Sequence, residues 1–257
     1  MKFKLEKLLF FDIESVSQYK DLYDMPEDKL KMWMSYYETF RKKVTDEGRM
    51  PTVESMTLLN NNKGTAISSY VDKEELEKET YKEVYRQTAA FFAEFGKVAC
   101  VSMGFVTKEG KTKYESFYGE DEVDILKKTR EVFDKIDPMG FDLCGQSIGF
   151  FDIPFLGKRF VINGLKPPKI FPSHDTKPWE LKIVDTKDIW SFGNKWGLGS
   201  LDLICSSLNI DSPKNGDVKG DNVTTNYWLG NHEEIKEYCE RDVKALIDII
   251  TKFNNLK

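Results

Sequence analysis

The chain has 257 residues, of which 40% are hydrophobic and 32% are charged, as is ordinary for a soluble globular domain. Its formal net charge of −5 excludes the strongly basic balance of a protein that coats DNA. No run approaches the roughly 20 apolar residues that a membrane span needs, and no signal-peptide core follows the basic N-terminus. We therefore expect a cytoplasmic protein.

The first third of the chain predicts one strand followed by helices. The apolar run Leu8–Phe11 predicts a buried strand that runs directly into Asp12 and Glu14. Pro26–Gly48 and Asp72–Phe95 have apolar residues at helical spacing, and each predicts a helix. Between them, Arg49–Val71 is polar and predicts a surface loop. We therefore expect a helical insertion over residues 17–95.

The rest of the chain alternates between strands and helices. The predicted strands are Val98–Thr107, Lys111–Tyr118, Phe141–Gly145 and Ile183–Asp185. The predicted helices are Asp121–Ile136, Asp152–Asn163, Ser200–Leu208 and Glu233–Phe253. Asn231 and Glu234 predict a capping box at the start of the last helix. This order predicts an α/β fold with a mixed five-stranded sheet flanked by helices, in a single domain over residues 1–257.

Two carboxylates follow the first predicted strand. Asp12 and Glu14 are two residues apart, so on a strand their side chains point to the same face. Neighbouring carboxylates repel each other unless a cation lies between them, and their hard oxygen atoms favour Mg²⁺ or Mn²⁺. Solvated strand ends also carry such pairs, so the pair by itself leaves both interpretations open.

A third carboxylate, Asp152, stands between the apolar runs Gly149–Phe151 and Ile153–Leu156. An ionised carboxylate in such surroundings is costly unless it is paired. The local sequence fits two roles that are compatible with each other. The residue either caps the helix that follows it or faces a cation.

Tyr238 and Asp242 are four residues apart in the last predicted helix, so they share one face. That face also meets the apolar stripe of the helix. A core tyrosine with a helical hydrogen-bond neighbour is the alternative to a functional pair.

The remaining metal-ligating residues are few. The four cysteines are far apart and form no CxxC pair, so we expect buried thiols rather than a zinc site or disulfides. Two histidines make a histidine-built metal site an unpromising interpretation. Between Ile153 and Ser200, eight basic residues stand against four acidic ones. This segment is a candidate phosphate-facing surface, with a plain solvated surface as the alternative.

Together, the acidic motifs resemble those of the DnaQ-like 3′–5′ exonucleases of the tyrosine type, which have a ribonuclease H-like fold. Asp12–Glu14 resembles the first motif, Gly149–Asp152 the second and Tyr238–Asp242 the third. The closer resemblance is to the stand-alone exonucleases related to the proofreading domain of B-family DNA polymerases, as found in Bacteroidota and their phages. It covers Leu5–Val16 and most of Glu94–Ile250. Its supporting stretches are Glu94–Val98, Phe151–Leu156, Lys158–Arg159, Lys177–Glu180, Gly199–Asp202, Ser212–Lys214 and Tyr238–Val243.

The resemblance implies a metal-dependent 3′–5′ exonuclease that hydrolyses single-stranded DNA ends with two divalent ions, Mg²⁺ or Mn²⁺. The implied metal ligands are Asp12, Glu14, Asp152 and Asp242, and Tyr238 would orient the attacking water. Predicted substrate contacts are Ile13, Ser147, Phe151, Lys158, Arg159 and Lys195. Phe151 would stack on the terminal base or ribose, with a core phenylalanine as the alternative. Ser147 stands where the family has asparagine, which puts its contacts in doubt.

Two other functions stay open. An RNA 3′-end trimming exonuclease would use the same motifs, because the metal chemistry does not distinguish ribose from deoxyribose. A nucleic-acid-binding or scaffold protein on a decayed nuclease fold is favoured only by Ser147. A role in DNA replication as a proofreader would need a polymerase partner, whereas a role in DNA repair would not. The location would be the host cytoplasm if a phage encodes the chain.

Overall fold

The computed structural model describes residues 2–46, 73–194 and 199–256. The chain forms two compact units, one of Met1–Val16 with Lys97–Lys257 and one of Ser17–Gly96. The strands are β1 (Leu8–Ser17), β2 (Gly96–Val106), β3 (Thr112–Tyr118), β4 (Asp142–Gly145) and β5 (Ile183–Asp185). The first unit has the helices α4 (Glu122–Ile136), α5 (Asp152–Ile162), α6 (Thr186–Ser191), α7 (Leu201–Leu208), α8 (Val223–Trp228) and α9 (His232–Asn254).

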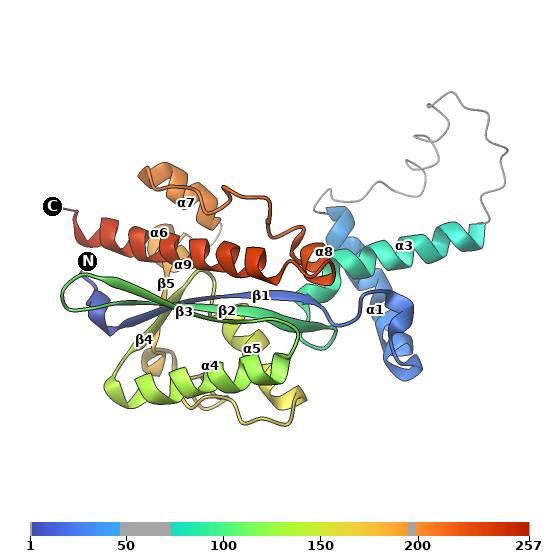
Figure 1. Cartoon of the computed structure of the whole chain (residues 1–257), viewed down its shortest axis with the longest axis horizontal. Coiled ribbons are helices and arrows are strands. Elements are labelled where there is room, and N and C mark those ends of the chain that lie inside the picture. The colour runs from blue at the N-terminus through green and yellow to red at the C-terminus, as the bar shows by residue number, and fades with distance from the viewer. Residues whose placement is uncertain (1, 47–72, 195–198, 257) are drawn as a thin grey trace. The chain divides into compact units, whose positions relative to one another are not determined.

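The sheet of the first unit has the strand order β3-β2-β1-β4-β5. Strand β2 pairs with β3 in antiparallel fashion, whereas β4 runs parallel to both β1 and β5. Helix α9 covers one face of the sheet, and α4 and α5 lie on the other (Figure 1). The predicted α/β fold, with a mixed five-stranded, ribonuclease H-like sheet flanked by helices, is confirmed.

The central strand β1 is buried on both faces. Leu8 and Phe10 belong to an apolar cluster with Val243 of α9. Phe11 points to the opposite face, where its ring lies edge-on to Phe133 of α4 with the centroids 5.5 Å apart. Each such side chain contributes roughly 1.5–3 kcal/mol by leaving water. This alternation fixes which residues of β1 look toward α9.

Strand β1 continues to Ser17, so the prediction that Asp12 and Glu14 lie at the end of the strand is wrong. The prediction depended on the apolar run, which ends at Phe11, directly before Asp12. Ile13 and Val16 are nevertheless buried, and they keep the strand in the sheet beyond that point. The acidic pair therefore lies inside the central strand rather than at its end.

Three further differences concern helices. The capping box predicted for α9 is wrong, because the side chain of Asn231 makes no cap hydrogen bond and donates instead to Asn226 at 2.9 Å. The six-residue helices α6 and α8 were not predicted, since they are too short to show a helical period. No helix in the described ranges is long and apolar enough to cross a membrane.

The second unit is built on α1 (Glu27–Asp46) and α3 (Lys73–Thr88). Its core centres on Trp33, which has no exposed surface. The indole stacks on Phe40 with the centroids 4.2 Å apart and meets Tyr85 edge-on at 5.1 Å. Two helices and a cluster of rings therefore make a core of their own.

Both helices predicted within residues 17–95 are present, with different ends. Helix α1 matches the prediction Pro26–Gly48 as far as the structure describes it. The second prediction, Asp72–Phe95, ran too long, because α3 ends at Thr88 and a 3₁₀ turn follows. The predicted loop Arg49–Val71 lies outside the described residues.

Candidate active site

Asp12 and Glu14 lie on the face of β1 that looks toward α9. They continue the alternation of Leu8 and Phe10, which pack against that helix. Glu14 is only 9% exposed, and Asp12 is partly buried. The strand therefore brings two carboxylates into a layer whose other members are apolar.

Helix α9 brings three side chains to this pair. Tyr238 and Asp242 are one turn apart, both are buried, and the tyrosine hydroxyl hydrogen-bonds to the carboxylate. Cys239 lies between them in sequence and is fully buried. Its Sγ lies 3.4 Å from the backbone oxygen of Asp12 and 3.4 Å from Oδ2 of the same residue. The third motif therefore meets the first across the interface of helix and sheet.

Asp152 is the first residue of α5, directly after the turn that follows β4. Its Oδ1 accepts a hydrogen bond from the backbone N–H of Ile13 at 3.3 Å, and its side chain is buried. The cap position of α5 is Phe151, so the interpretation of Asp152 as a helix cap is wrong. The hydrogen bond instead ties this third acid to the strand residue that lies between the other two.

Burial governs the protonation of all four carboxylates. It raises the pKa of Asp152 and that of Asp242 to about 7. It raises the pKa of Asp12 and that of Glu14 well above their usual values, and the charge of Asp242 raises both further. The negative charge of each ionised carboxylate therefore makes the neighbouring carboxylates harder to ionise.

This donor set fits a divalent cation. In the described ranges, no lysine or arginine forms an ion pair with any of the four carboxylates. Single ligand atoms of Asp12, Glu14 and Cys239 lie within 4.8 Å of one another. Buried like charges without a counter-charge are costly, and a cation held by carboxylate oxygens removes that cost. The carboxylate oxygens of this cluster could therefore hold a divalent cation.

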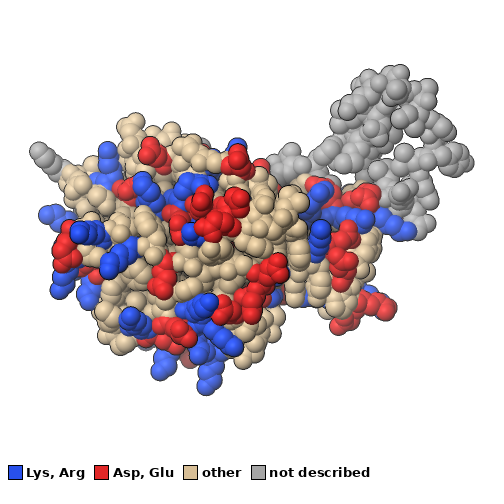
Figure 2. Space-filling model, in the orientation of Figure 1, with Lys and Arg blue, Asp and Glu red and all other residues tan. Residues whose placement is uncertain are grey.

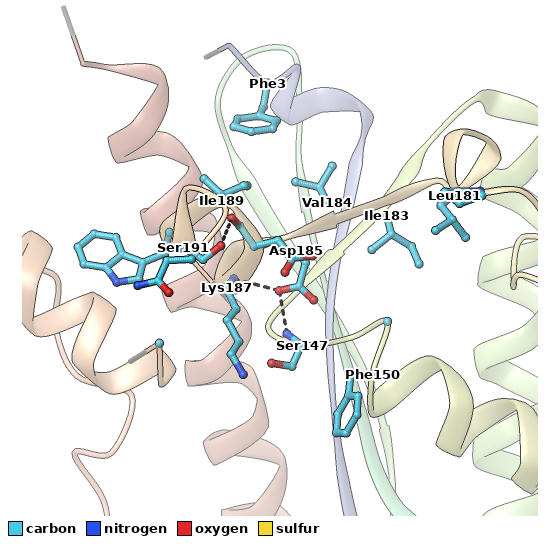
Figure 3. Close-up of a pocket in the computed structure, with 16 residues that line it drawn as sticks. Phe3, Ser147, Phe150, Leu181, Ile183, Val184, Asp185, Lys187, Ile189 and Ser191 are labelled. Atoms are coloured by element: carbon cyan, nitrogen blue, oxygen red, sulfur yellow. Dashed lines mark hydrogen bonds between the residues drawn. The ribbon is translucent and has the colours of Figure 1, made fainter. Parts of the chain in front are cut away.

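The turn before Asp152 is held by an acid that the sequence did not single out. Ser147 has a left-handed backbone with a φ of 57°, a conformation that asparagine adopts more readily than serine. Its N–H donates to Oδ1 of Asp185 at 3.0 Å, and the same oxygen accepts from the N–H of Lys187 at 2.9 Å (Figure 3). Asp185 therefore fixes a backbone conformation for which serine is a poor choice.

The predicted phosphate contacts need one correction. Arg159 is buried, and its guanidinium donates to both carboxylate oxygens of Glu122, at 2.8 Å and 2.5 Å, so it is not presented to a phosphate. Lys158 is exposed, and Lys195 lies outside the described residues. On the face shown in Figure 2, basic and acidic side chains are interspersed.

The predicted apolar contacts lie mostly inside the protein. Ile13 is buried, and its backbone N–H is bonded to Asp152. Phe151 is half-buried, with its ring centroid 5.4 Å from that of Phe155. The neighbouring Phe150 is 88% exposed. The exposed aromatic ring of this turn is therefore one residue away from the predicted one.

Besides Asp185, the sequence analysis missed three residues of the site, which are Cys239, Lys214 and Arg241. All four cysteines are free and buried, as expected, but one of them, Cys239, contacts a carboxylate of the site. Lys214 and Arg241 approach Asp242 closely enough for their charges to lower its pKa against the larger effect of burial. The thiol had one available clue, its place between the tyrosine and the aspartate of the third motif. Lys214 stands in Ser212–Lys214, one of the stretches that support the family resemblance, although no role was predicted for it.

Comparisons with known proteins show which family and which solved structures the chain is similar to. The model of a family described as "predicted 3′–5′ exonuclease related to the exonuclease domain of PolB" matches residues 90–246. Among 26 matching chains of solved structures is the family B DNA polymerase of the hyperthermophilic archaeon Pyrobaculum calidifontis, at 15% identity and a TM-score of 0.49. That match covers 62% of this chain and 22% of the polymerase, so the chain spans about a fifth of the polymerase's length. No curated protein matches.

Proposed function

Because the chain belongs to the family of predicted 3′–5′ exonucleases related to the exonuclease domain of PolB, we propose that it removes nucleotides from the 3′ end of single-stranded DNA. The proposed chemistry is phosphodiester hydrolysis with two divalent ions, Mg²⁺ or Mn²⁺. The family's relation to PolB supports DNA over RNA as the substrate. Trimming in DNA repair, or proofreading with a polymerase partner, is the proposed role.

The observation that carries the proposal is the convergence of the acids from three distant segments. The family match begins at residue 90, so Asp12 and Glu14 lie outside it. They nevertheless lie against α9, where Cys239 contacts Asp12, and Asp152 is bonded to the residue between them. The fold thus assembles the donor set that such a hydrolase needs, from residues that the match does not include as well as from residues that it does.

The metal ligands would be Asp12, Glu14, Asp152 and Asp242. Exonuclease domains of this kind generally use divalent metals. Bound divalent cations supply a more acidic water and neutralise the charge that develops on the phosphate and the departing oxygen. Holding those cations is the part that the buried carboxylates perform, since their mutual repulsion favours the occupied form.

Tyr238 acts as a hydrogen-bond donor rather than as a base. Burial and the charges of Glu14, Asp242 and Asp12 all raise its pKa. Its hydroxyl therefore keeps its proton at neutral pH. A protonated phenol beside the carboxylates can orient an attacking water through that hydroxyl, whereas it cannot remove a proton from the water.

Two other groups position the acids. The thiol of Cys239 donates to Oδ2 of Asp12, and the N–H of Ile13 donates to Oδ1 of Asp152. Each bond fixes one carboxylate oxygen and leaves the second oxygen of that group for a cation. Such supporting contacts are worth roughly 10–100-fold in metal affinity or activity.

The test is an incubation with 5′-labelled single-stranded DNA and with RNA of the same sequence. Each is followed with Mg²⁺, with Mn²⁺ or with EDTA. We expect a metal-dependent ladder of shortened DNA that is absent from the Asp152→Ala variant. A matched control is Glu237→Ala, which removes an exposed acid from the same helix as Asp242 and should cleave like the wild type.

The other outcomes name other functions. A ladder on RNA alone would move the protein to RNA 3′-end processing. Intact substrates under every condition, with retained binding of the strands, would leave a nucleic-acid-binding protein on a nuclease fold. An Asp152→Ala variant that still cleaves would remove Asp152 from the metal site.

A further inference from the structure

The segment Ser212–Gly220 lies between α7 and α8 in the chain and runs along α9 beside the candidate active site (Figure 1). It forms no helix or strand, yet its residues Pro213 and Val218 are buried. Val218 belongs to the same apolar cluster as Tyr238. A Cβ atom at Gly220 would lie 3.8 Å from the hydroxyl oxygen of Tyr238. The segment therefore packs beside the tyrosine that the proposed chemistry uses.

Arg241 joins this segment to α9. Its Nε donates a hydrogen bond to the backbone oxygen of Pro213 at 3.1 Å. The guanidinium also lies against Gly216, where a Cβ atom would be 2.6 Å from Nη2 and 3.1 Å from Cζ. Glycine permits this close approach, because any other residue has a Cβ atom that would displace the guanidinium. The hydrogen bond and the close contact together hold the segment against the helix.

The same guanidinium lies over the ring of Tyr238. Its Cζ is 5.8 Å from the ring centroid, within the roughly 6 Å of a cation–π contact. Arg241 follows Tyr238 by three residues, so the two side chains are neighbours on the surface of α9. The hydroxyl of this tyrosine hydrogen-bonds to Asp242. One side chain therefore contacts both the covering segment and the ring that carries the hydroxyl.

We propose that Arg241 is a positioning residue, which clamps Ser212–Gly220 beside Tyr238 and so holds the tyrosine hydroxyl in the orientation that serves the attacking water. The inference rests on the proposed function and adds a residue to it. Without the clamp, the ring loses contacts on one side, and its hydroxyl no longer has a single orientation. A planar guanidinium suits this role, since it donates within its plane and stacks with its face, whereas the ammonium of lysine supplies the charge alone.

The first test separates the geometry of Arg241 from its charge. Arg241→Met removes both, and Arg241→Lys keeps the charge. With 5′-labelled single-stranded DNA and Mg²⁺, we expect kcat to fall about tenfold in each variant. The matched control is Lys252→Met, which removes an exposed basic residue from the last turn of α9 and should cleave like the wild type. Full activity in Arg241→Lys would show that charge alone is needed, and would overturn the clamp.

The second test asks whether Arg241 acts through the tyrosine hydroxyl. In Tyr238→Phe, a further Arg241→Met should lower kcat less than twofold, because the group that it positions is already missing. Gly216→Ala should lower kcat about as much as Arg241→Met and add nothing to that variant. The backbone φ of Gly216 is not positive, so alanine acts there through its Cβ contact with the guanidinium. An equal loss from Arg241→Met with and without the hydroxyl would overturn the inference and leave the proposed function intact.

Hydrogen exchange measures the clamp without any cleavage. Within the segment, the N–H of Lys214 donates to Oγ of Ser212 at 3.1 Å, and the N–H of Gly216 donates to the backbone oxygen of Lys214 at 3.0 Å. We expect Arg241→Met to speed the exchange of these two amides about tenfold, with Lys252→Met unchanged. Unchanged exchange in Arg241→Met would overturn the clamp. Faster exchange in a protein that cleaves nothing would support the clamp and overturn the proposed function.

Discussion

Two groups of buried charges in the same unit are treated in opposite ways. Glu122 accepts hydrogen bonds from Val98, Arg159 and Asn163, so its carboxylate is paired and saturated by the protein itself. Among the residues that the structure describes, no basic side chain forms an ion pair with the acids around Asp152, and burial raises their pKa values. A charge that serves the fold is neutralised by the fold. A charge that binds a ligand is neutralised by that ligand, and without the ligand it lowers the stability of the fold.

The sharpest way to break this comparison is to remove one charge from the acidic group without changing its shape. Asp152→Asn keeps an oxygen for the N–H of Ile13 and removes one metal-ligand charge. We expect cleavage to fall roughly a thousandfold or more, because the lost group is part of the donor set for the cations. Single-turnover cleavage of 5′-labelled DNA measures this. Circular dichroism that matches the wild type is the control for folding.

Removing one charge from the buried pair of Arg159 and Glu122 should lower the stability of the fold. Arg159→Met leaves Glu122 ionised and unpaired in a dry site, and we expect a loss of roughly 3–5 kcal/mol in the free energy of unfolding. Urea titration measures the loss. The double variant Glu122→Gln with Arg159→Met should recover part of it. If the free energy of unfolding of Arg159→Met were within about 1 kcal/mol of the wild-type value, the pair would not stabilise the fold.

A smaller effect is expected at the tyrosine. Tyr238→Phe removes only the hydroxyl that hydrogen-bonds to Asp242. We expect the rate to fall roughly 10–100-fold while metal affinity is retained, since the ring and the four carboxylates stay in place. Metal affinity from calorimetry, beside kcat, separates these effects. Unchanged kinetics would show that the hydroxyl does not position water.

The sequence was sufficient for the parts of this comparison that depend on local period. Alternation in β1 and the spacing of four in α9 put Asp12 with Glu14, and Tyr238 with Asp242, on common faces. The alternation of strands and helices predicted a mixed five-stranded sheet, but it did not predict the order of the strands. The sequence alone could not predict how deeply each side chain is buried, because burial depends on packing between distant segments.

The misses have that same origin. Arg159 was predicted to contact a phosphate, because its actual partner, Glu122, lies 37 residues away in sequence and was not foreseen. Cys239 was assigned to the core, correctly, but its contact with Asp12 spans 227 residues. Phe150 and Phe151 are equivalent by composition, and only the turn at Ser147 decides which ring is exposed. Long-range contacts and backbone conformation thus set what local pattern leaves undetermined.

A further effect is expected in the dependence of stability on pH. A carboxyl whose folded pKa is raised to about 7, as for Asp152 and Asp242, destabilises the folded state once it ionises. In EDTA, the penalty is absent below the unfolded pKa of about 4 and complete above about pH 7, so the melting temperature should fall between about pH 4 and pH 7. Each kcal/mol is worth about 2–4 °C in a domain of this size.

Mg²⁺ or Mn²⁺ should reduce this fall in melting temperature, and Asp152→Asn should reduce it without metal. Arg159→Met should lower the melting temperature at every pH, because its effect does not pass through these acids. If the melting temperature depended on pH in the same way in EDTA and in metal from about pH 4 to pH 7, the acids would not form a cation-binding site.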